Sequence, residues 1–221
     1  MRMTKILLAS NSARRRELIK LTGWDFAAIA TDTNEDRLPA EPARDYVMRL
    51  AREKTRAVPQ EAPGEYVLTA DTIVVENETL FGKPIDAEDA RRILRELRGH
   101  NHTVMTAIAL YDRNAQSLIM DLCSSIVPMR DYSEAEIDTY IASGDAMDKA
   151  GAYAIQNASF HPVSQFSGCF ASVMGMPLCH LARSALKLGL TTTTGLPTRC
   201  QSTLSYECRI HEAVLRGDII G

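Results

Sequence analysis

Residues 5–21 read KILLASNSARRRELIKL and join a short apolar strand to a basic helix. The apolar run at residues 5–9 predicts a buried strand. Small polar residues, beginning with Ser10, follow this strand and are typical helix caps, so we expect a helix from Ala13 to Leu21. Unpaired backbone N–H groups and the positive end of the helix dipole make such a junction favourable for an anion.

Three adjacent arginines, Arg14, Arg15 and Arg16, begin this helix. A guanidinium group matches the oxygens of a phosphate, but three neighbouring side chains cannot all point in one direction. We therefore expect one or two of them to contact a bound anion, and a solvated basic helix start is the alternative. The junction lacks the Gly-x-x-x-x-Gly-Lys pattern, which excludes a P-loop.

After this first strand and helix, predicted strands and helices continue to alternate in the first half of the chain, and the middle is predicted to form hairpins. Residues 26–30 and 66–75 are predicted strands, 43–57 and 87–97 helices, 103–111 and 117–129 a strand pair, 148–156 a turn with a short strand, 160–173 a hairpin and 177–188 a helix, and Ser133 with Glu136 forms a capping box. This order predicts an α/β fold with a mixed, partly antiparallel twisted sheet flanked by helices. We expect one domain over residues 1–190 and a C-terminal extension of uncertain structure over 191–221.

The composition is that of an ordinary globular protein, with 45% hydrophobic and 24% charged residues among 221. The net charge of −3 gives no overall attraction to nucleic acid or membranes, so anion binding must come from local basic clusters. The five cysteines are odd in number and form no C-x-x-C pair, which argues against a disulfide framework and a structural zinc site. Reduced thiols and a first apolar run too short for a signal peptide predict a cytoplasmic protein.

Asp71 interrupts the most apolar predicted strand. A carboxylate in such a strand is costly unless it is paired or bound to a metal. At the end of a strand it would lie beside a cleft at the sheet edge, which makes it a candidate catalytic group. A buried aspartate with a purely structural partner is the alternative.

Other candidate site residues are less distinctive. Lys83 lies in a turn before a helix, where a solvent-exposed lysine is the ordinary alternative, and Gln156 follows a glycine-rich segment and could read a nucleobase edge through its donor and acceptor. Glu35 and Lys54 do not stand out alone. The alternating pair at positions 100 and 102 lacks a third ligand, so we expect no histidine-based metal site.

Several of these segments also occur together in one known family. The chain resembles the Maf family of nucleoside triphosphate pyrophosphatases over about Ile6 to Leu188. The stretches that carry the resemblance are LLASNSARRREL (7–18), ARDYVMRLAREKTRA (43–57), ADTIVVENETLFGKPIDAEDARRILREL (70–97), HTVMTAIAL (102–110), YIASGDAMDKAGAYAIQ (140–156) and VMGMPL (173–178). Several independent motifs in the right order make the resemblance specific.

The resemblance implies a Maf/ITPase-like α/β fold with a central substrate cleft, a homodimer, and a divalent metal, magnesium or manganese. It implies that Asp71 is the proton acceptor and that Glu35 and Asp71 hold the metal. The implied phosphate-binding residues are Ser10, Arg15, Lys54 and Lys83. One departure is Ala13, where the family usually has proline; its loss should loosen the helix start without abolishing anion binding.

Three positions distinguish branches of that family. Arg14, Thr72 and Gln156 resemble the branch that acts on dTTP and UTP. We therefore expect hydrolysis of dTTP and UTP, or of modified pyrimidine nucleotides, to the monophosphate and pyrophosphate, with no nucleic-acid or membrane partner. The alternative is a non-catalytic nucleotide-binding regulator of cell division, although carboxylates facing a polyanion favour an enzyme.

Overall fold

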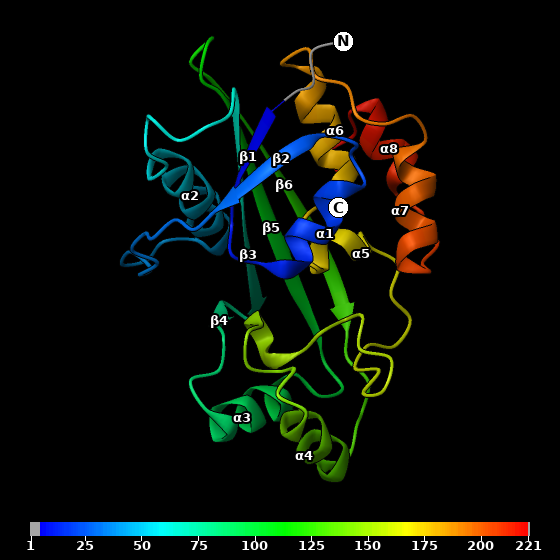
Figure 1. The fold of residues 1–221 in the computed structure, drawn as a ribbon. Helices are drawn as coiled ribbons and strands as arrows, with labels where there is room; N and C mark the ends of the chain where they lie inside the picture. The colour runs from blue at the N-terminus through cyan, green and yellow to red at the C-terminus, as the bar shows by residue number, and fades with distance from the viewer. Residues whose placement is uncertain (1–4, 221) are drawn as a thin grey trace.

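A six-stranded mixed sheet forms the centre of the computed structural model, which describes residues 5–220 (Figure 1). Its strands are β1 (Lys5–Ala9), β2 (Asp25–Ile29), β3 (Tyr66–Glu76), β4 (Thr79–Phe81), β5 (Asn101–Asp112) and β6 (Ser117–Pro128). The order is β2-β1-β3-β5-β6, with β4 paired to β3. β1 runs parallel to β2 and β3, and the other pairs are antiparallel, so the predicted mixed α/β fold is confirmed.

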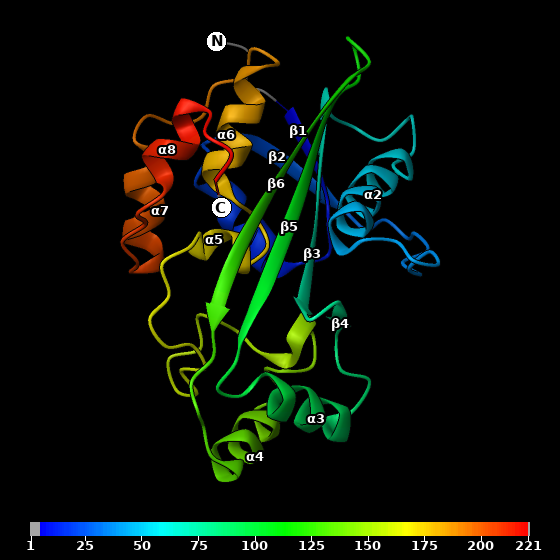
Figure 2. The same cartoon turned by 180° about the vertical axis from the view of Figure 1, so that it is seen from behind.

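Helices cover both faces of the sheet and one of its ends (Figures 1 and 2). They are α1 (Ala13–Lys20), α2 (Ala43–Arg56), α3 (Ala87–Leu97), α4 (Glu134–Ala142), the short 3₁₀ turn η1 (Ala150–Ala152), α5 (Phe170–Val173), α6 (Leu178–Leu186), α7 (Leu196–Leu204) and α8 (His211–Arg216). α2 packs on one face, and α1, α5 and α6 pack on the other. α3 and α4 lie together at one end, and none of the helices in residues 5–220 could cross a membrane.

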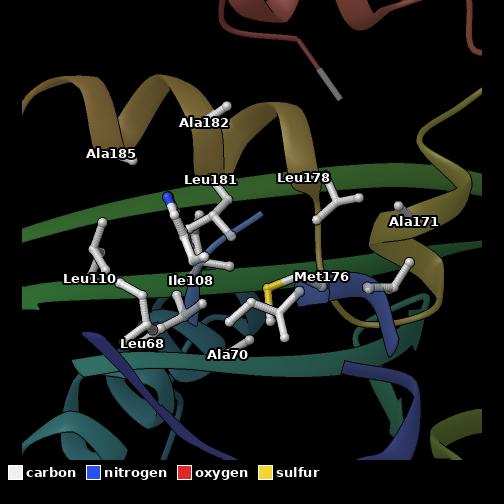
Figure 3. Packing of buried hydrophobic residues seen from close by; sticks show 14 of the residues in the cluster. Leu68, Ala70, Ile108, Leu110, Ala171, Met176, Leu178, Leu181, Ala182 and Ala185 are labelled. Carbon is white, nitrogen blue, oxygen red and sulfur yellow. The ribbon is translucent and has the colours of Figure 1, made fainter. Parts of the chain in front are cut away.

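The main core lies between the sheet and α6 (Figure 3). Successive side chains of a strand point to opposite faces, so Leu68 and Ala70 of β3 face α6, while Asp71 faces α2. Figure 3 shows Leu181 of α6 above this layer, and its side chain is fully buried. β3 therefore delivers the Asp71 carboxylate to the face opposite the largest hydrophobic cluster.

Two predicted elements are wrong. Residues 148–156 contain η1 and no strand, and residues 160–173 form an irregular segment with α5 rather than a hairpin. Side chains take the backbone partners that a strand would need: Asn157 accepts from the Phe160 N–H at 2.7 Å, and Arg130 donates to the Phe160 carbonyl at 2.9 Å. Pro162 also has no backbone N–H to donate to a neighbouring strand.

The C-terminal extension is helical and packs against the rest of the chain. Leu196 of α7 and Val214 of α8 are buried, and α7 and α8 both contact α6. Arg183 of α6 donates to the Asp218 carbonyl at 2.7 Å, which ties the last residues to this helix. The boundary at residue 190 stays a prediction.

Candidate active site

A local gap in the sheet creates the candidate site. β1 pairs with β3 only as far as Leu68, and β4 pairs with β3 from Val74 onward. Between these two residues, the edge of β3 that faces β1 has neither strand as a partner. The carboxyl end of β1 and the start of α1 meet at this gap, which is where ligands bind in many α/β sheets.

A cavity of about 570 Å³ lies at the gap. A volume of roughly 300–1,000 Å³ is typical of small-molecule sites. The structure brings all nine predicted site residues to its lining: Ser10, Arg14, Arg15, Glu35, Lys54, Asp71, Thr72, Lys83 and Gln156. They come from the junction between β1 and α1, from α1, the loop before α2, α2, β3, the turn after β4 and the segment after η1.

Lys54 joins the two predicted metal-binding carboxylates. Its ammonium Nζ contacts Asp71 Oδ1 on β3 and lies 2.7 Å from Glu35 Oε1. The Lys54 and Asp71 side chains are each 11% exposed, whereas that of Glu35 is 59% exposed. Burial alone would raise the pKa of Glu35, but the hydrogen bond and charge of Lys54 outweigh it and hold that pKa below its ordinary value. Glu35 is therefore ionised at neutral pH.

The loop that carries Glu35 is fixed by α2. The Tyr46 hydroxyl donates to the Glu35 carbonyl at 2.6 Å. One turn later, Arg49 donates to the Asp36 carbonyl at 2.9 Å and makes two hydrogen bonds with the Glu41 carboxylate, of 2.7 and 2.8 Å. Helix α2 thus positions both Lys54 and the backbone of its partner.

Arg15 lies at the opposite wall of the cavity. Its Nε donates to the Gly175 carbonyl at 2.9 Å, and its Nη2 donates to Thr72 Oγ1 at 3.0 Å. Gly175 has φ +107°, and a Cβ there would lie 3.1 Å from Arg15 Nε, so the close approach requires glycine. Burial lowers the pKa of Arg15, although the charge of Asp71 opposes this shift and the group stays charged.

The donor and acceptor roles of the Thr72 hydroxyl follow from those of Thr106. Thr106 Oγ1 donates to the Ser172 carbonyl at 2.7 Å, which uses its only proton. Thr72 must then donate to Thr106 across 3.0 Å and accept from Arg15. This chain of hydrogen bonds connects β3, β5 and α5 to the guanidinium group.

The remaining predicted residues line the rim and the start of α1. Ser10 Oγ accepts from the Ser12 N–H at 3.2 Å and from Arg15 Nη1 at 3.4 Å. Arg14 Nη1 lies 3.2 Å from Asp148 Oδ2, so this arginine bridges α1 and the segment before η1. Lys83 and Gln156 are exposed, with Lys83 in the turn whose Gly82 carbonyl accepts from the Gly151 N–H at 3.0 Å.

Sequence reasoning missed three features of this site. Tyr46 lies within the predicted helix 43–57, but no sequence pattern indicated that its hydroxyl holds the loop that carries Glu35. Lys149 is 6% exposed and lies at the cavity, and its place beside an aspartate was the only signal for it. His102 is buried and hydrogen-bonded to the Tyr153 hydroxyl at 2.8 Å, and burial lowers its pKa to about 4. No sequence signal identified this neutral histidine as a support for the cavity wall.

The carboxylates fit a hard divalent cation. Asp71 and Glu35 both contact one ammonium group, so their oxygens are close enough to share a cation. Mg²⁺ usually takes one or two carboxylates and completes its shell with water and substrate phosphates. Residues 5–220 contain no cluster of three or more His, Cys, Asp or Glu ligands, so the other positions would fall to phosphate oxygens and water.

Comparisons with known proteins identify the family to which the chain is similar. The model of a family described as Maf-like protein matches residues 5–187. A dTTP/UTP pyrophosphatase of Anaeromyxobacter dehalogenans (strain 2CP-C) is 45% identical over 188 residues, which cover 84% of this chain and 94% of that protein. A dTTP/UTP pyrophosphatase of Escherichia coli O6:K15:H31 (strain 536 / UPEC) is 46% identical over 177 residues, 80% of this chain and 89% of its own length.

A third relative, a dTTP/UTP pyrophosphatase of Geobacter sp. (strain M21), is 40% identical over 189 residues, 86% of this chain and 98% of that protein. Among solved structures, a crystal structure of a Vibrio cholerae protein is 15% identical, covers 80% of this chain and 91% of its own, and has a TM-score of 0.41. That likeness is too weak to bear on the fold.

Proposed function

The chain belongs to the Maf-like protein family, and from that premise we propose that it hydrolyses dTTP and UTP to the nucleoside monophosphate and pyrophosphate. The observation that carries this proposal is the meeting of three cationic side chains, Arg15, Lys54 and Lys83, with Asp71 in one cavity. These residues are far apart in the sequence and come from four different elements of the fold. Modified pyrimidine nucleotides have the same chemistry and are further candidate substrates.

Charge neutralisation is the first task of the site. A triphosphate carries about four negative charges, and phosphoryl transfer depends mainly on positioning and on electrostatic stabilisation of the moving charge. Arg15 and Lys54 lie at opposite walls, and Lys83 lies at the rim. Positive charges on three sides of the cavity are suited to the separate phosphate groups of one triphosphate.

Asp71 is the proposed proton acceptor. Its carboxylate would take the proton of the attacking water, which forms a bond to the α-phosphorus while the bond to the pyrophosphate oxygen breaks. Lys54 holds Asp71 in place and offsets the phosphate charge. Mg²⁺ or Mn²⁺, held by Asp71 and Glu35, would stabilise phosphate charge and acidify a bound water.

Gln156 is the proposed reader of the pyrimidine. Its carboxamide offers one acceptor and two donors from an exposed position at the cavity wall. Gln156→Glu replaces the donor by a second acceptor, so the activity with dTTP and UTP should fall while the fold stays intact. An unchanged order of substrate preference would remove this role from Gln156.

Two further proposals concern the state of the protein. A homodimer is supported by the long edge strand β6, on which Leu118, Met120 and Leu122 are only partly buried. Light scattering coupled to size-exclusion chromatography tests the homodimer, and a monomeric mass would contradict it.

A cytoplasmic location is supported by five cysteines that are all free thiols.

Product analysis tests the central proposal. Purified protein with Mg²⁺ should convert dTTP into dTMP and pyrophosphate, and a canonical set of triphosphates establishes the preference. Release of single phosphates would contradict the proposed cleavage site. Tight binding of dTTP without turnover would instead favour a regulator that only binds nucleotides.

A further inference from the structure

The cavity wall that carries Gln156 is held by residues that no part of the mechanism uses. Within residues 5–220, the Gln156 side chain makes no hydrogen bond that meets ordinary geometric limits, so its position depends on its neighbours in the chain. We propose that Asp145 is a positioning residue that fixes Gln156 against the nucleobase and thereby sets the preference for pyrimidines. This inference rests on the proposed function and deepens it.

Asp145 holds the chain on both sides of Gln156. Asn157 Nδ2 donates to Asp145 Oδ2 at 2.9 Å. The Tyr140 hydroxyl donates to the same oxygen at 3.1 Å and accepts from the Ala154 N–H at 3.0 Å. Residues 154 and 157 are therefore both connected to one carboxylate oxygen, and Gln156 lies between them.

The groups that connect Asp145 to this segment are themselves rigid. The Tyr140 ring is 3% exposed and stacks on Phe160, with centroids 4.2 Å apart and planes inclined by 6°. Asn157 Oδ1 accepts from the Phe160 N–H at 2.7 Å, which orients its amide so that Nδ2 points to Asp145. Neither group can turn away from the carboxylate without losing a second contact.

The second oxygen of Asp145 has a charged partner. Lys149 Nζ donates to Asp145 Oδ1 at 2.8 Å, and the lysine is 6% exposed. Burial alone would raise the pKa of Asp145, but hydrogen bonds from Lys149 and Asn157 outweigh it and hold the pKa below its ordinary value. The group is a carboxylate at neutral pH, and it can accept from all of its donors at once.

An asparagine at this position cannot do the same. Its one oxygen can accept either from Lys149 or from the Tyr140 and Asn157 donors, and its amino group then faces a donor on the other side. Asp145→Asn is therefore nearly isosteric but releases one side of the network. The segment around Gln156 should become mobile while Asp71 and its partners, on other elements, are unchanged.

The test compares nucleotide preference in four variants. Asp145→Asn and Tyr140→Phe each interrupt the network, the second while keeping the stack on Phe160. Asp145→Glu keeps both acceptor oxygens and should restore most of the preference. Asp138→Asn is the control, because it removes a carboxylate from the same helix as Tyr140, where it pairs with Arg91 away from the cavity.

Affinities for the non-hydrolysable α,β-imido analogues of UTP and GTP provide a readout that does not depend on turnover. We expect the ratio of the two affinities to fall about tenfold in Asp145→Asn, to fall in part in Tyr140→Phe, and to be unchanged in Asp138→Asn. With hydrolysable UTP, KM should rise while kcat stays within about twofold. A merely structural role would lower the unfolding temperature and leave the ratio unaltered.

The outcomes separate this inference from the proposed function. An unchanged ratio in a folded Asp145→Asn protein overturns the role of Asp145, and so does a wild-type protein that binds both analogues equally. If Asp145→Asn fails to fold, the ratio in Tyr140→Phe decides. Failure of the proposed function would appear separately, as absence of pyrophosphate release by the wild-type protein.

Discussion

Replacing Asp71 by asparagine tests the catalytic role sharply, because the chain contains a matched structural carboxylate. The side chains of Asp71 and Asp121 are 11% and 12% exposed, and each pairs with a cation. Asp121 lies on β6 and accepts from Arg183 at 2.6 and 2.7 Å and from Ser184 at 3.1 Å, outside the lining of the cavity. The two substitutions change shape and charge equally, so only the location differs.

Asp71→Asn should greatly lower kcat and cost little stability, whereas Asp121→Asn should cost more stability and leave kcat nearly unchanged. Loss of a general base costs roughly 10²–10⁴ in kcat, which is about 3–5 kcal/mol of activation free energy. Asp71→Asn should cost only about 1 kcal/mol of stability, because Lys54 keeps Glu35 as its partner. Asp121→Asn should cost about 2–4 kcal/mol, because Arg183 loses its only carboxylate within the described residues.

Steady-state pyrophosphate release from dTTP and thermal unfolding measure the two quantities on the same samples. The unfolding temperature of Asp121→Asn should fall by roughly 5–15 °C with kcat nearly unchanged. The reasoning fails if Asp71→Asn keeps more than a tenth of the wild-type kcat. It also fails if both variants lose kcat in parallel, because burial alone would then explain the effect.

Three further substitutions test other parts of the argument. Lys54→Met removes the group that lowers the pKa of Glu35, while the burial that raises this pKa remains. The pKa of Glu35 measured by ¹³C NMR should therefore rise, and the acid limb of the residual activity should move to higher pH. An unchanged pKa of Glu35 would contradict the pairing with Lys54. His102 has a pKa of about 4 instead of 6.5, so its contribution to the free energy of unfolding is fully present above pH 6.5 and is lost as the pH falls toward 4. In urea unfolding, the free energy of unfolding of the wild-type protein should therefore fall by about 2 kcal/mol more between pH 8 and pH 5 than that of His102→Phe. An equal pH dependence in the two proteins would refute this assignment. Leu181→Ala should lower the free energy of unfolding by about 2–5 kcal/mol and leave kcat per folded molecule unchanged, because Leu181 is fully buried away from the cavity.

Local sequence patterns identified Asp71 because a carboxylate within an apolar strand needs a partner. They could not identify that partner, because Lys54 is on a helix and meets Asp71 only when α2 packs on β3. Glu35 is harder still. It lies in a polar loop without periodicity, and its place depends on the Tyr46 hydroxyl, a contact that a helical pattern does not reveal. The family resemblance, rather than local chemistry, pointed to Glu35 in advance.

The strands were predictable because β1 and β3 are short apolar runs that are buried almost continuously, and the long helices α2 and α3 because their buried residues recur with the helical period. The segment from residue 160 to residue 173 was not, because periodicity shows which side chains are buried but not where the backbone groups find partners. Phe160 is buried against Tyr132 and Tyr140, as many strand residues are, yet its backbone N–H and carbonyl bond to side chains. α7 was not predicted, because Leu196 is its one buried residue and its other core contacts, Cys200 and Leu204, are only partly buried.

In the proposed function, the cavity would bind a polyanion by exchanging the partners of its cations rather than by holding an excess of unpaired positive charge. Lys54 is already bound to Asp71 and Glu35, and Arg15 is held by a backbone carbonyl and a threonine hydroxyl. Lys83 has no ion pair within 4.0 Å in residues 5–220, and it lies exposed at the rim. A phosphate can therefore meet Lys83 first at little cost, while Lys54 must share its ammonium between carboxylate and phosphate. A chain with net charge −3 can in this way keep stable, buried cations and still offer positive charge where a nucleotide enters.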